Sequence, residues 1–174
     1  MEDDYYEEDN GRFKKFLIPF IGILILIIFI TYIFTNAAGI DVLGGLISSS
    51  KLKENEVDFS LNGKVIFDDK TLDELKNIYF ENLRNEFKVC LYGKKENNLY
   101  FINKLAVPKT YSKTFNQVIA EPCSDEALIS LHSHPYKRCL PSEQDFETFS
   151  KFKEKTPNAL MVIMCEENRF YIYD

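Results

Sequence analysis

Residues 127–145 of the sequence read ALISLHSHPYKRCLPSEQD, and this stretch decides both the fold and the chemistry expected of the chain. Its apolar start, Ala127 to Leu131, predicts a buried strand that runs directly into His132 and His134. Residues two apart on a strand point to the same face, so both imidazoles are presented together where Pro135 ends the strand. Two neighbouring neutral imidazoles suit a divalent cation such as zinc.

A third metal ligand is expected from the segment that follows the histidines. Ser142 to Lys155 predicts a helix, and the S-x-x-D spacing of Ser142 and Asp145 is typical of a helix N-terminus. Asp145 would then lie on the first turn with its carboxylate facing the histidines. Three protein ligands with an open fourth position is the catalytic zinc arrangement. From the residues alone, the alternatives are a plain helix cap and a histidine pair that binds nothing.

The cysteines are widely scattered, with no C-x-x-C pair that would indicate a structural zinc site. Cys90 and Cys165 lie in apolar strand patterns and are expected to be core thiols. Cys139, between the expected ligands, is either a reactive thiol or a plain loop residue. Together with Cys123 they show no evident pairing, which favours a reducing compartment, because secreted domains tend to pair their cysteines.

Residues 55–174 predict a single α/β domain, which is long enough to bury one core. Short apolar stretches flank the turn pair Asn62-Gly63 and predict a strand pair within residues 57–67. The capping box formed by Thr71 and Glu74 predicts a helix that runs to about Asn85. Further strands are expected at residues 87–92, 99–107, 115–119 and 127–131, with a closing hairpin at 159–165 and 170–173.

The N-terminal part differs from the domain in composition. Residues 1–15 are rich in acidic side chains and predict a disordered tail. No charged residue occurs between Lys15 and Asp41, and residues 16–35 predict a single transmembrane helix. A cleaved signal peptide and a buried globular helix are the alternatives. Residues 36–54, rich in Gly and Ser, predict a flexible linker or a short interfacial helix.

Charge constrains both the partners and the orientation of the chain. The formal net charge is −6 and no block of basic residues occurs, which argues against nucleic-acid binding. Arg12, Lys14 and Lys15 precede the apolar helix, whereas Lys51 and Lys53 follow it at the margin of the range that matters. The positive-inside rule therefore weakly places the domain outside, against the indication of the cysteines.

The spacing of the candidate ligands resembles the motif of the JAMM (MPN+/JAB) metalloprotease family. His132, His134 and Pro135 are followed by Ser142, eight residues after His134, and then by Asp145. The resemblance covers about residues 72–174 and implies a mixed β-sheet wrapped by helices, similar to cytidine deaminases. It implies that His132, His134 and Asp145 hold one zinc ion with water as the fourth ligand, and that Ser142 stabilises the oxyanion.

The resemblance also implies a catalytic glutamate just before the strand that follows the first helix of the domain. Glu86 fits that place, with Glu81 and Glu121 as rivals. Glu86 would act as general base and then as general acid in the hydrolysis of a peptide or isopeptide bond. The family's typical substrate is the C-terminus of a ubiquitin-like modifier, and the compact domain favours a small β-grasp modifier or a sulfur-carrier precursor.

These inferences lead to a membrane-anchored zinc metallopeptidase as the expected function. Because ubiquitin-like modification is cytosolic, the cytoplasmic side is favoured for the domain; a domain facing outward would instead act on an ordinary peptide or an exported protein. One alternative is a catalytically inactive JAMM-like module that binds a protein partner at the membrane. The other is a deaminase, which lacks support because no P-C-x-x-C run follows the histidines.

Overall fold

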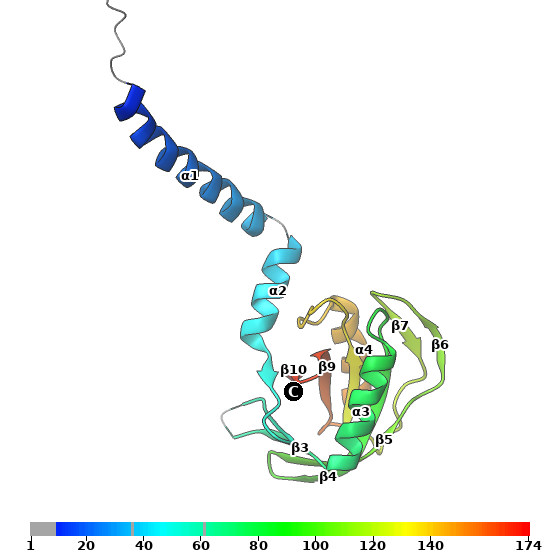
Figure 1. Ribbon diagram of the computed structural model, residues 1–174. Coiled ribbons are helices and arrows are strands. Elements are labelled where there is room, and N and C mark those ends of the chain that lie inside the picture. The colour runs from blue at the N-terminus through cyan, green and yellow to red at the C-terminus, as the bar shows by residue number, and fades with distance from the viewer. Residues whose placement is uncertain (1–9, 36, 61) are drawn as a thin grey trace, which may run out of the picture. The chain divides into compact units, whose positions relative to one another are not determined.

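The computed structural model describes residues 10–35, 37–60 and 62–174 (Figure 1). The chain divides into two compact units between Ile40 and Asp41, and each is described by itself. Most of the tail expected at the N-terminus, residues 1–9, lies outside the described residues. Helix α1 begins at Asn10, so residues 10–15 belong to a helix.

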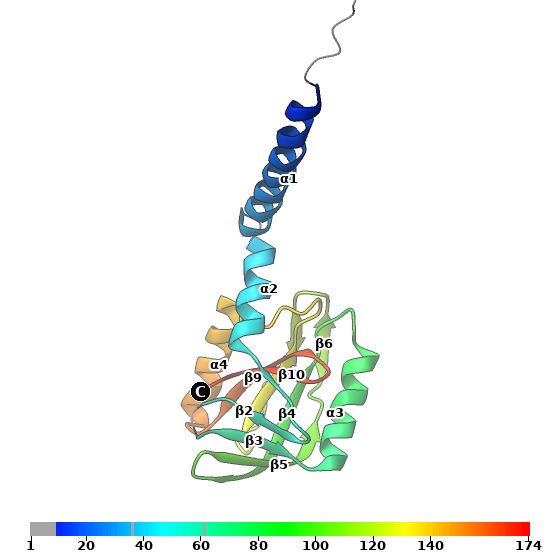
Figure 2. The ribbon, with the colours of Figure 1, turned by 60° about the vertical axis from the view of Figure 1, so that its left-hand side comes forward.

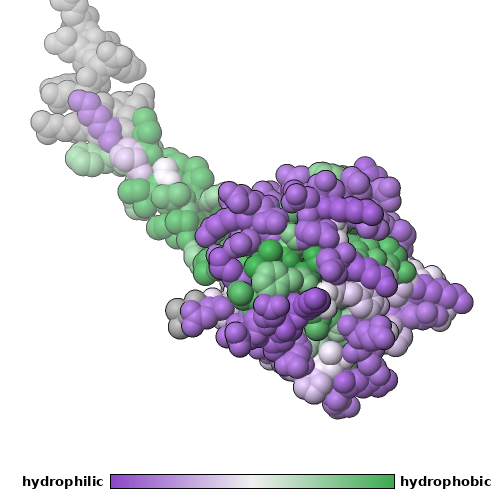
Figure 3. All heavy atoms as spheres, turned by 90° about the horizontal axis from the view of Figure 1, so that it is seen from below, coloured by the Kyte–Doolittle hydropathy of each residue, from purple (hydrophilic) through white to green (hydrophobic). Residues whose placement is uncertain are grey.

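Helix α1 (Asn10–Thr35) is the described element of the first unit. Its segment Lys15–Phe34 has a mean hydropathy of 2.9 and is long and apolar enough to cross a membrane. None of this segment is buried within the described chain, and the part of α1 visible in Figure 3 is mainly apolar, whereas the domain face shown there is mostly hydrophilic. Pro19 lies inside the helix, where it removes one backbone donor, a loss that transmembrane helices tolerate.

The second unit is an α/β domain built on one mixed sheet of eight strands (Figure 1, Figure 2). The strand order is β1-β10-β9-β8-β4-β5-β3-β2, and β6 and β7 form a separate pair. β8 runs parallel to β9, and β3 runs parallel to β5. The strands are β1 (Ser50–Lys51), β2 (Glu56–Asp58), β3 (Lys64–Phe67), β4 (Lys88–Glu96), β5 (Leu99–Ala106), β6 (Thr110–Lys113), β7 (Val118–Ala120), β8 (Ile129–Ser133), β9 (Leu160–Glu166) and β10 (Arg169–Tyr173).

Both strand pairs expected at the ends of the domain are confirmed. β2 pairs antiparallel with β3, and β9 pairs antiparallel with β10. The strand expected to end before Gly93 is longer, because β4 continues to Glu96 through a bulge between Tyr92 and Gly93. A side chain at Gly93 would collide with the backbone of Phe101 on β5, so only glycine allows this close approach.

Helices α3 (Asp69–Glu81) and α4 (Glu143–Lys155) cover opposite faces of the sheet. Leu72 and Leu75 of α3 belong to the larger core cluster, with Val89 and Leu131 of the central strands. The smaller cluster on the other face joins α4 to Cys90 and the adjoining strands. The larger core cluster therefore lies on the α3 face of the sheet and the smaller one on the α4 face.

Helix α3 begins earlier and ends earlier than expected. Asp68 is its N-cap, and its carboxylate accepts the backbone N–H of Thr71 at 2.6 Å, which holds the pKa of Asp68 below its ordinary value. Thr71 is buried inside the first turn, so the predicted capping box at Thr71 is wrong. The helix ends at Glu81 and not near Asn85, because the backbone N–H of Asn82 bonds back to the Tyr79 carbonyl.

The segment expected as a linker is mostly ordered. Helix α2 (Ala37–Ser48), the short helix considered as the alternative, occupies most of it, and β1 pairs with β10. Arg169 donates from Nη1 to the carbonyl of Leu46 and to Oγ of Ser49, both at 3.1 Å. The structured domain therefore begins before residue 55.

All four cysteines are paired in disulfides, Cys90 with Cys123 and Cys139 with Cys165. This finding corrects the expectation of unpaired core thiols. The apolar strand patterns correctly predicted burial, but burial does not distinguish a thiol from a disulfide. The partners are 33 and 26 residues apart in the sequence, and only the tertiary fold brings their Cα atoms to 5.6 and 5.2 Å.

Candidate metal centre

The candidate site lies on one face of β4 and β8, which are antiparallel neighbours in the sheet. Cys90 of β4 lies opposite Ser130 of β8, and Cys90 packs in the cluster beneath α4. Because side chains alternate along a strand, the even-numbered residues of both strands share this face. His132 lies on the same face in β8, and Glu86 and His134, which flank the two strands, line the same pocket.

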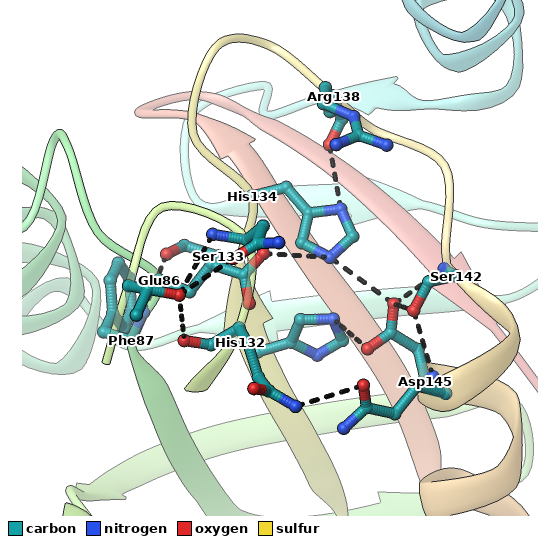
Figure 4. Close-up of polar contacts among 12 residues, drawn as sticks. Glu86, Phe87, His132, Ser133, His134, Arg138, Ser142 and Asp145 are labelled. Carbon is teal, nitrogen blue, oxygen red and sulfur yellow. Dashed lines mark hydrogen bonds and ion pairs between the residues drawn. The ribbon is translucent and has the colours of Figure 1, made fainter. Parts of the chain in front are cut away.

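His132 and His134 form the centre of the site (Figure 4). Both side chains are buried, and their ring centroids are 4.9 Å apart. Nε2 of His132 lies 3.1 Å from Oδ1 of Asp145, and Nε2 of His134 lies 3.4 Å from Oδ2. One ligand atom from each of the three residues lies within 4.8 Å of the others, close enough to hold one metal ion. The structure therefore brings together the three residues predicted as ligands.

Ser142 and the first turn of α4 orient Asp145. Ser142 is the N-cap: its Oγ accepts the Asp145 N–H at 3.3 Å, and its own N–H donates to Oδ2 of Asp145 at 2.7 Å. The Ser142 hydroxyl also donates to Oδ2 at 2.7 Å. Asp145 is therefore both the capping-box partner of Ser142 and the predicted ligand.

The carboxylate of Asp145 is held in its charged form. Burial raises the pKa of Asp145, but the close contacts with His132 and His134, together with the backbone N–H of Ser142, outweigh this effect. The pKa of Asp145 consequently lies well below its ordinary value, and the group is available as an anionic ligand.

The loop between the two ligand segments fixes the tautomer of His134. Nδ1 of His134 lies 3.2 Å from the carbonyl oxygen of Arg138. A carbonyl can only accept, so Nδ1 is the donor, and in the neutral imidazole this leaves the lone pair of Nε2 for the site. Tyr136 and Lys137 both lie in the left-handed region, with φ of 59° and 60°, and this conformation turns the loop back toward His134.

Two cross-links clamp this loop to the β9–β10 hairpin. The Cys139–Cys165 disulfide joins the loop to β9, and Nζ of Lys137 lies 2.9 Å from Oε1 of Glu166. The local strain at Lys137 is therefore held in place by contacts on both sides of it. The carbonyl that orients His134 belongs to a fixed segment.

The donor set fits a divalent metal such as zinc. Nε2 of His132 is buried and, within the described part of the chain, makes no hydrogen bond of adequate geometry, although Asp145 lies nearby. Burial lowers the pKa of His132, against the effect of Asp145, and this favours the neutral imidazole that a metal requires. Two neutral imidazoles and one carboxylate are a donor set that holds catalytic zinc.

Glu86 is the second carboxyl group of the site. Its side chain is buried, with Oε1 3.7 Å from Nε2 of His134. Its backbone N–H donates to the carbonyl of Thr114 at 2.7 Å, which fixes its place at the start of β4. Burial raises the pKa of Glu86 to about 7, and the Asp145 charge adds to this effect, whereas His134 and Arg138 oppose it.

The rival glutamates lie elsewhere. Glu81 is exposed at the end of α3, and Glu121 is exposed and accepts a hydrogen bond from the Tyr111 hydroxyl at 3.0 Å. Neither residue lines the pocket that contains the histidines. Among the three candidates, Glu86 alone faces the proposed ligands.

The pocket has a volume of about 640 Å³ and extends beyond the motif residues. Its walls are the segment 115–118 beside β7, the first turns of α4 and the loop 135–141. Gln117 donates from Nε2 to Oε1 of Gln144 at 3.3 Å, which links two of these walls. The floor continues along the sheet to Lys88 and Ser130, which the motif does not include. Both residues occupy even positions of their strands. The strand alternation that places His132 and His134 on one face could therefore have indicated that Lys88 and Ser130 share a face with Cys90 and His132.

These features define the class: an α/β protein with a candidate His-His-Asp metal site in a pocket on one face of a mixed sheet. No protein-family model matches the chain, and no curated protein matches it. Among solved structures, the chain is similar to the crystal structure of a JAB1/MPN domain protein from Archaeoglobus fulgidus, with 24% identity and a TM-score of 0.39. The similarity covers 59% of this chain and 82% of that protein.

Proposed function

We propose that this protein is a zinc-dependent metallopeptidase that hydrolyses peptide or isopeptide bonds. The observation that supports it is the convergence of three ligand atoms within 4.8 Å, from His132, His134 and Asp145, next to the buried carboxyl of Glu86. A structural metal site would need neither a pocket nor a second carboxyl group. The pocket leaves space for a substrate on the open side of the three ligands.

The functional residues of the site would have different tasks. When bound, a zinc ion would polarise the scissile carbonyl and acidify water at this place. Glu86 would take the proton of the attacking water and pass it to the leaving amine. The pKa of about 7, raised mainly by burial, suits a group that must first accept and then donate a proton near neutral pH.

Ser142 has two competing tasks. Its hydroxyl donates to Oδ2 of Asp145 at 2.7 Å, and one proton cannot serve two acceptors. To stabilise an oxyanion, the hydroxyl must leave Asp145 and turn toward the substrate. We therefore assign Ser142 as a positioning residue for Asp145 in the free protein and as an oxyanion donor in the complex with substrate.

We further propose that α1 anchors the chain in a membrane and that the domain faces the extracytoplasmic side. The pairing of all four cysteines removes the argument for a reducing compartment, since disulfides persist mainly in oxidising ones. The basic residues Arg12, Lys14 and Lys15 support the same orientation. The substrate would then be an ordinary peptide or an exported protein, whereas a ubiquitin-like or sulfur-carrier substrate belongs to the opposite orientation.

Metal analysis tests the function directly. The full chain, purified in detergent micelles, should contain about one zinc per chain, and His132→Ala/His134→Ala should contain none. Asp145→Ala should lower the zinc content and abolish hydrolysis. Glu86→Gln should keep zinc and lose about 10²–10⁴-fold in rate. The matched control is Glu81→Gln, which removes an exposed carboxylate outside the pocket and should change neither property.

The opposite results separate the alternatives. Absence of bound metal after zinc is supplied would overturn the proposal and favour a module that binds a protein partner. Full activity of Glu86→Gln in a zinc-loaded protein would remove Glu86 from the role of base. A membrane-impermeant protease added to intact cells should degrade the domain; complete protection would reverse the proposed orientation.

A further inference from the structure

The floor of the pocket carries a cation and a hydroxyl that the proposed chemistry does not use. Lys88 and Ser130 are half-buried and line the pocket together with His132. Within the described part of the chain, neither the Nζ of Lys88 nor the Oγ of Ser130 has a hydrogen-bond or ion-pair partner. Both lie on the same face of the sheet as His132, since Lys88 is opposite His132 and Ser130 is two residues before it.

Three other basic groups of the domain have carboxylate partners. Lys64 lies 2.6 Å from Glu56, and Nζ of Lys137 and Nε of Arg169 lie 2.9 and 3.0 Å from Glu166. Placing an ammonium group in a partly desolvated pocket without a counter-ion is unfavourable. An unpaired lysine at the floor of a pocket is therefore poised for an anion that comes from outside the chain.

The surroundings of Lys88 define the kind of anion. Buried Phe149 and Met161 and half-buried Val118 supply apolar walls, which suit an aliphatic stem. One ammonium and one hydroxyl match the two oxygens of a single carboxylate. The Glu86 carboxylate lies 3.7 Å from His134, and the Asp145 carboxylate contacts both histidines; within the described residues neither forms an ion pair with Lys88.

We propose that Lys88 and Ser130 form a specificity subsite for a substrate carboxylate next to the scissile bond. The inference rests on the proposed peptidase function and assigns its substrate class. Side chains directly opposite one another on antiparallel strands have Cβ atoms about 5 Å apart. Lys88 lies opposite His132, so the carboxylate that it binds belongs to a residue adjacent to the bond that is cut. The source is either an acidic side chain or the free C-terminus of the substrate.

Matched peptides test this specificity. Fluorescence-quenched octapeptides with an alanine background would carry Glu or Gln at one of the four central positions. A second pair would end in a carboxylate or a carboxamide. For the full chain in detergent micelles with zinc, kcat/KM should favour one acidic peptide about 10–100-fold over its neutral match. Lys88→Met should reduce this ratio to about 1, and Lys88→Glu should instead favour a peptide with Lys at that position.

The control variant is Lys94→Met, which removes an exposed lysine of the same strand that does not line the pocket. It should leave the Glu-to-Gln ratio unchanged. Zinc content measured on every variant shows whether a change in rate comes from the metal site. A preference for an acidic side chain and a preference for a terminal carboxylate both support the subsite, and they distinguish its two sources.

A binding measurement keeps this inference separate from the proposed function. Fluorescence anisotropy of the same peptides, with a label in place of the quencher pair, reports affinity without cleavage. If no peptide is cleaved but the acidic peptide binds about 10-fold more tightly through Lys88, the subsite stands and the peptidase proposal fails. If peptides are cleaved with no difference between Glu and Gln, and affinities are also equal, the subsite is overturned and the peptidase proposal stands. Equal affinities without cleavage overturn both.

Discussion

Leu131 and His132 are neighbours in β8, yet they belong to different parts of the molecule. Leu131 has no exposed surface and packs in the core on the α3 side, with Val89 of β4. His132 faces the pocket on the α4 side, where Lys88 lies opposite it on β4. The same two strands therefore contribute their odd residues to the larger core, whereas Lys88, Ser130 and His132, at even positions, line the pocket. Substitutions one position apart should have different consequences.

Removal of the Leu131 side chain, which packs in the core on the α3 side, should have the largest effect on stability. Leu131→Ala removes a fully buried side chain and should lower the free energy of unfolding by up to about 5 kcal/mol. The matched control, Ser130→Ala, removes only the hydroxyl of a half-buried neighbour and should stay within about 0.5 kcal/mol. Urea unfolding of the full chain in detergent micelles, followed by circular dichroism, measures both. Equal losses would contradict the division of the two faces.

Zinc should stabilise the folded domain through its ligands on the pocket side of the sheet and independently of Leu131 on the opposite side. At free zinc about 1,000 times its Kd, binding to the folded state should raise the free energy of unfolding by about 4 kcal/mol. His132→Ala should erase this increment, because it removes one of the three ligands. Leu131→Ala should keep it, although the variant starts from a lower stability. The same unfolding experiment with and without zinc checks this, and loss of the increment in Leu131→Ala would show that the faces are coupled.

Local periodicity explains why the candidate ligands could be predicted. The position of the histidines depends only on strand alternation, and Pro135 marks where the strand ends. Asp145 depends on a helix start that its own side chain helps to create, as the capping box with Ser142 confirms. Glu86 carried no such local signal, and only the resemblance to a known family indicated it. Its proposed role depends on a contact between the residues before β4 and those after β8.

The features that could not be predicted arise from tertiary contacts or from competing local signals. The two disulfides join residues 26 and 33 positions apart, and no spacing rule pairs them. At α3 the capping box predicted a start at Thr71, but the helix uses Asp68, three residues earlier, as its N-cap. Strand alternation alone indicates which face of β4 carries Lys88. That this face lies beside His132 follows only from the pairing of β4 with β8.

A smaller effect should appear in the metal-free protein as the pH changes. Burial raises the pKa of Glu86 from 4.5 to about 7, so the folded state holds its proton more tightly than the unfolded state. The resulting stabilisation is fully present below pH 4.5 and is lost as the pH rises through 7. Above that range, Glu86→Gln should be more stable than the wild type by up to about 3 kcal/mol.

Urea unfolding of the zinc-free wild type and of Glu86→Gln, at pH 5 and pH 8.5, would measure this difference. It should widen as the pH rises, because only the wild type gains a buried negative charge at position 86. Glu81→Gln, at an exposed position, should stay within about 0.5 kcal/mol of the wild type at both values. A wild type that is more stable than Glu86→Gln at pH 8.5 would mean that the carboxylate is well solvated or paired. That result would weaken the assignment of Glu86 as a base with a raised pKa.

The smallest effect concerns two adjacent glycines of α2 that lie against the loop carrying Arg138. Replacing a helical glycine by alanine gains about 1 kcal/mol of helix propensity. At Gly44 the new Cβ would lie 3.4 Å from Cδ1 of Leu140, an ordinary contact, so Gly44→Ala should be stabilising. At Gly45 it would lie 2.9 Å from Cβ and 3.1 Å from the backbone nitrogen of Cys139, which the disulfide to Cys165 holds in place.

Gly45→Ala should therefore lose about 1 kcal/mol instead of gaining it, because the overlap outweighs the propensity. It should also weaken zinc binding several-fold, since displacement of Cys139 moves the nearby Arg138 carbonyl that orients His134. Gly44→Ala should leave zinc affinity unchanged. Competition with a chromophoric chelator measures both affinities. If both alanine variants bind zinc equally, the loop adjusts independently of α2. The zinc affinity of the site would then depend on the sheet and not on α2.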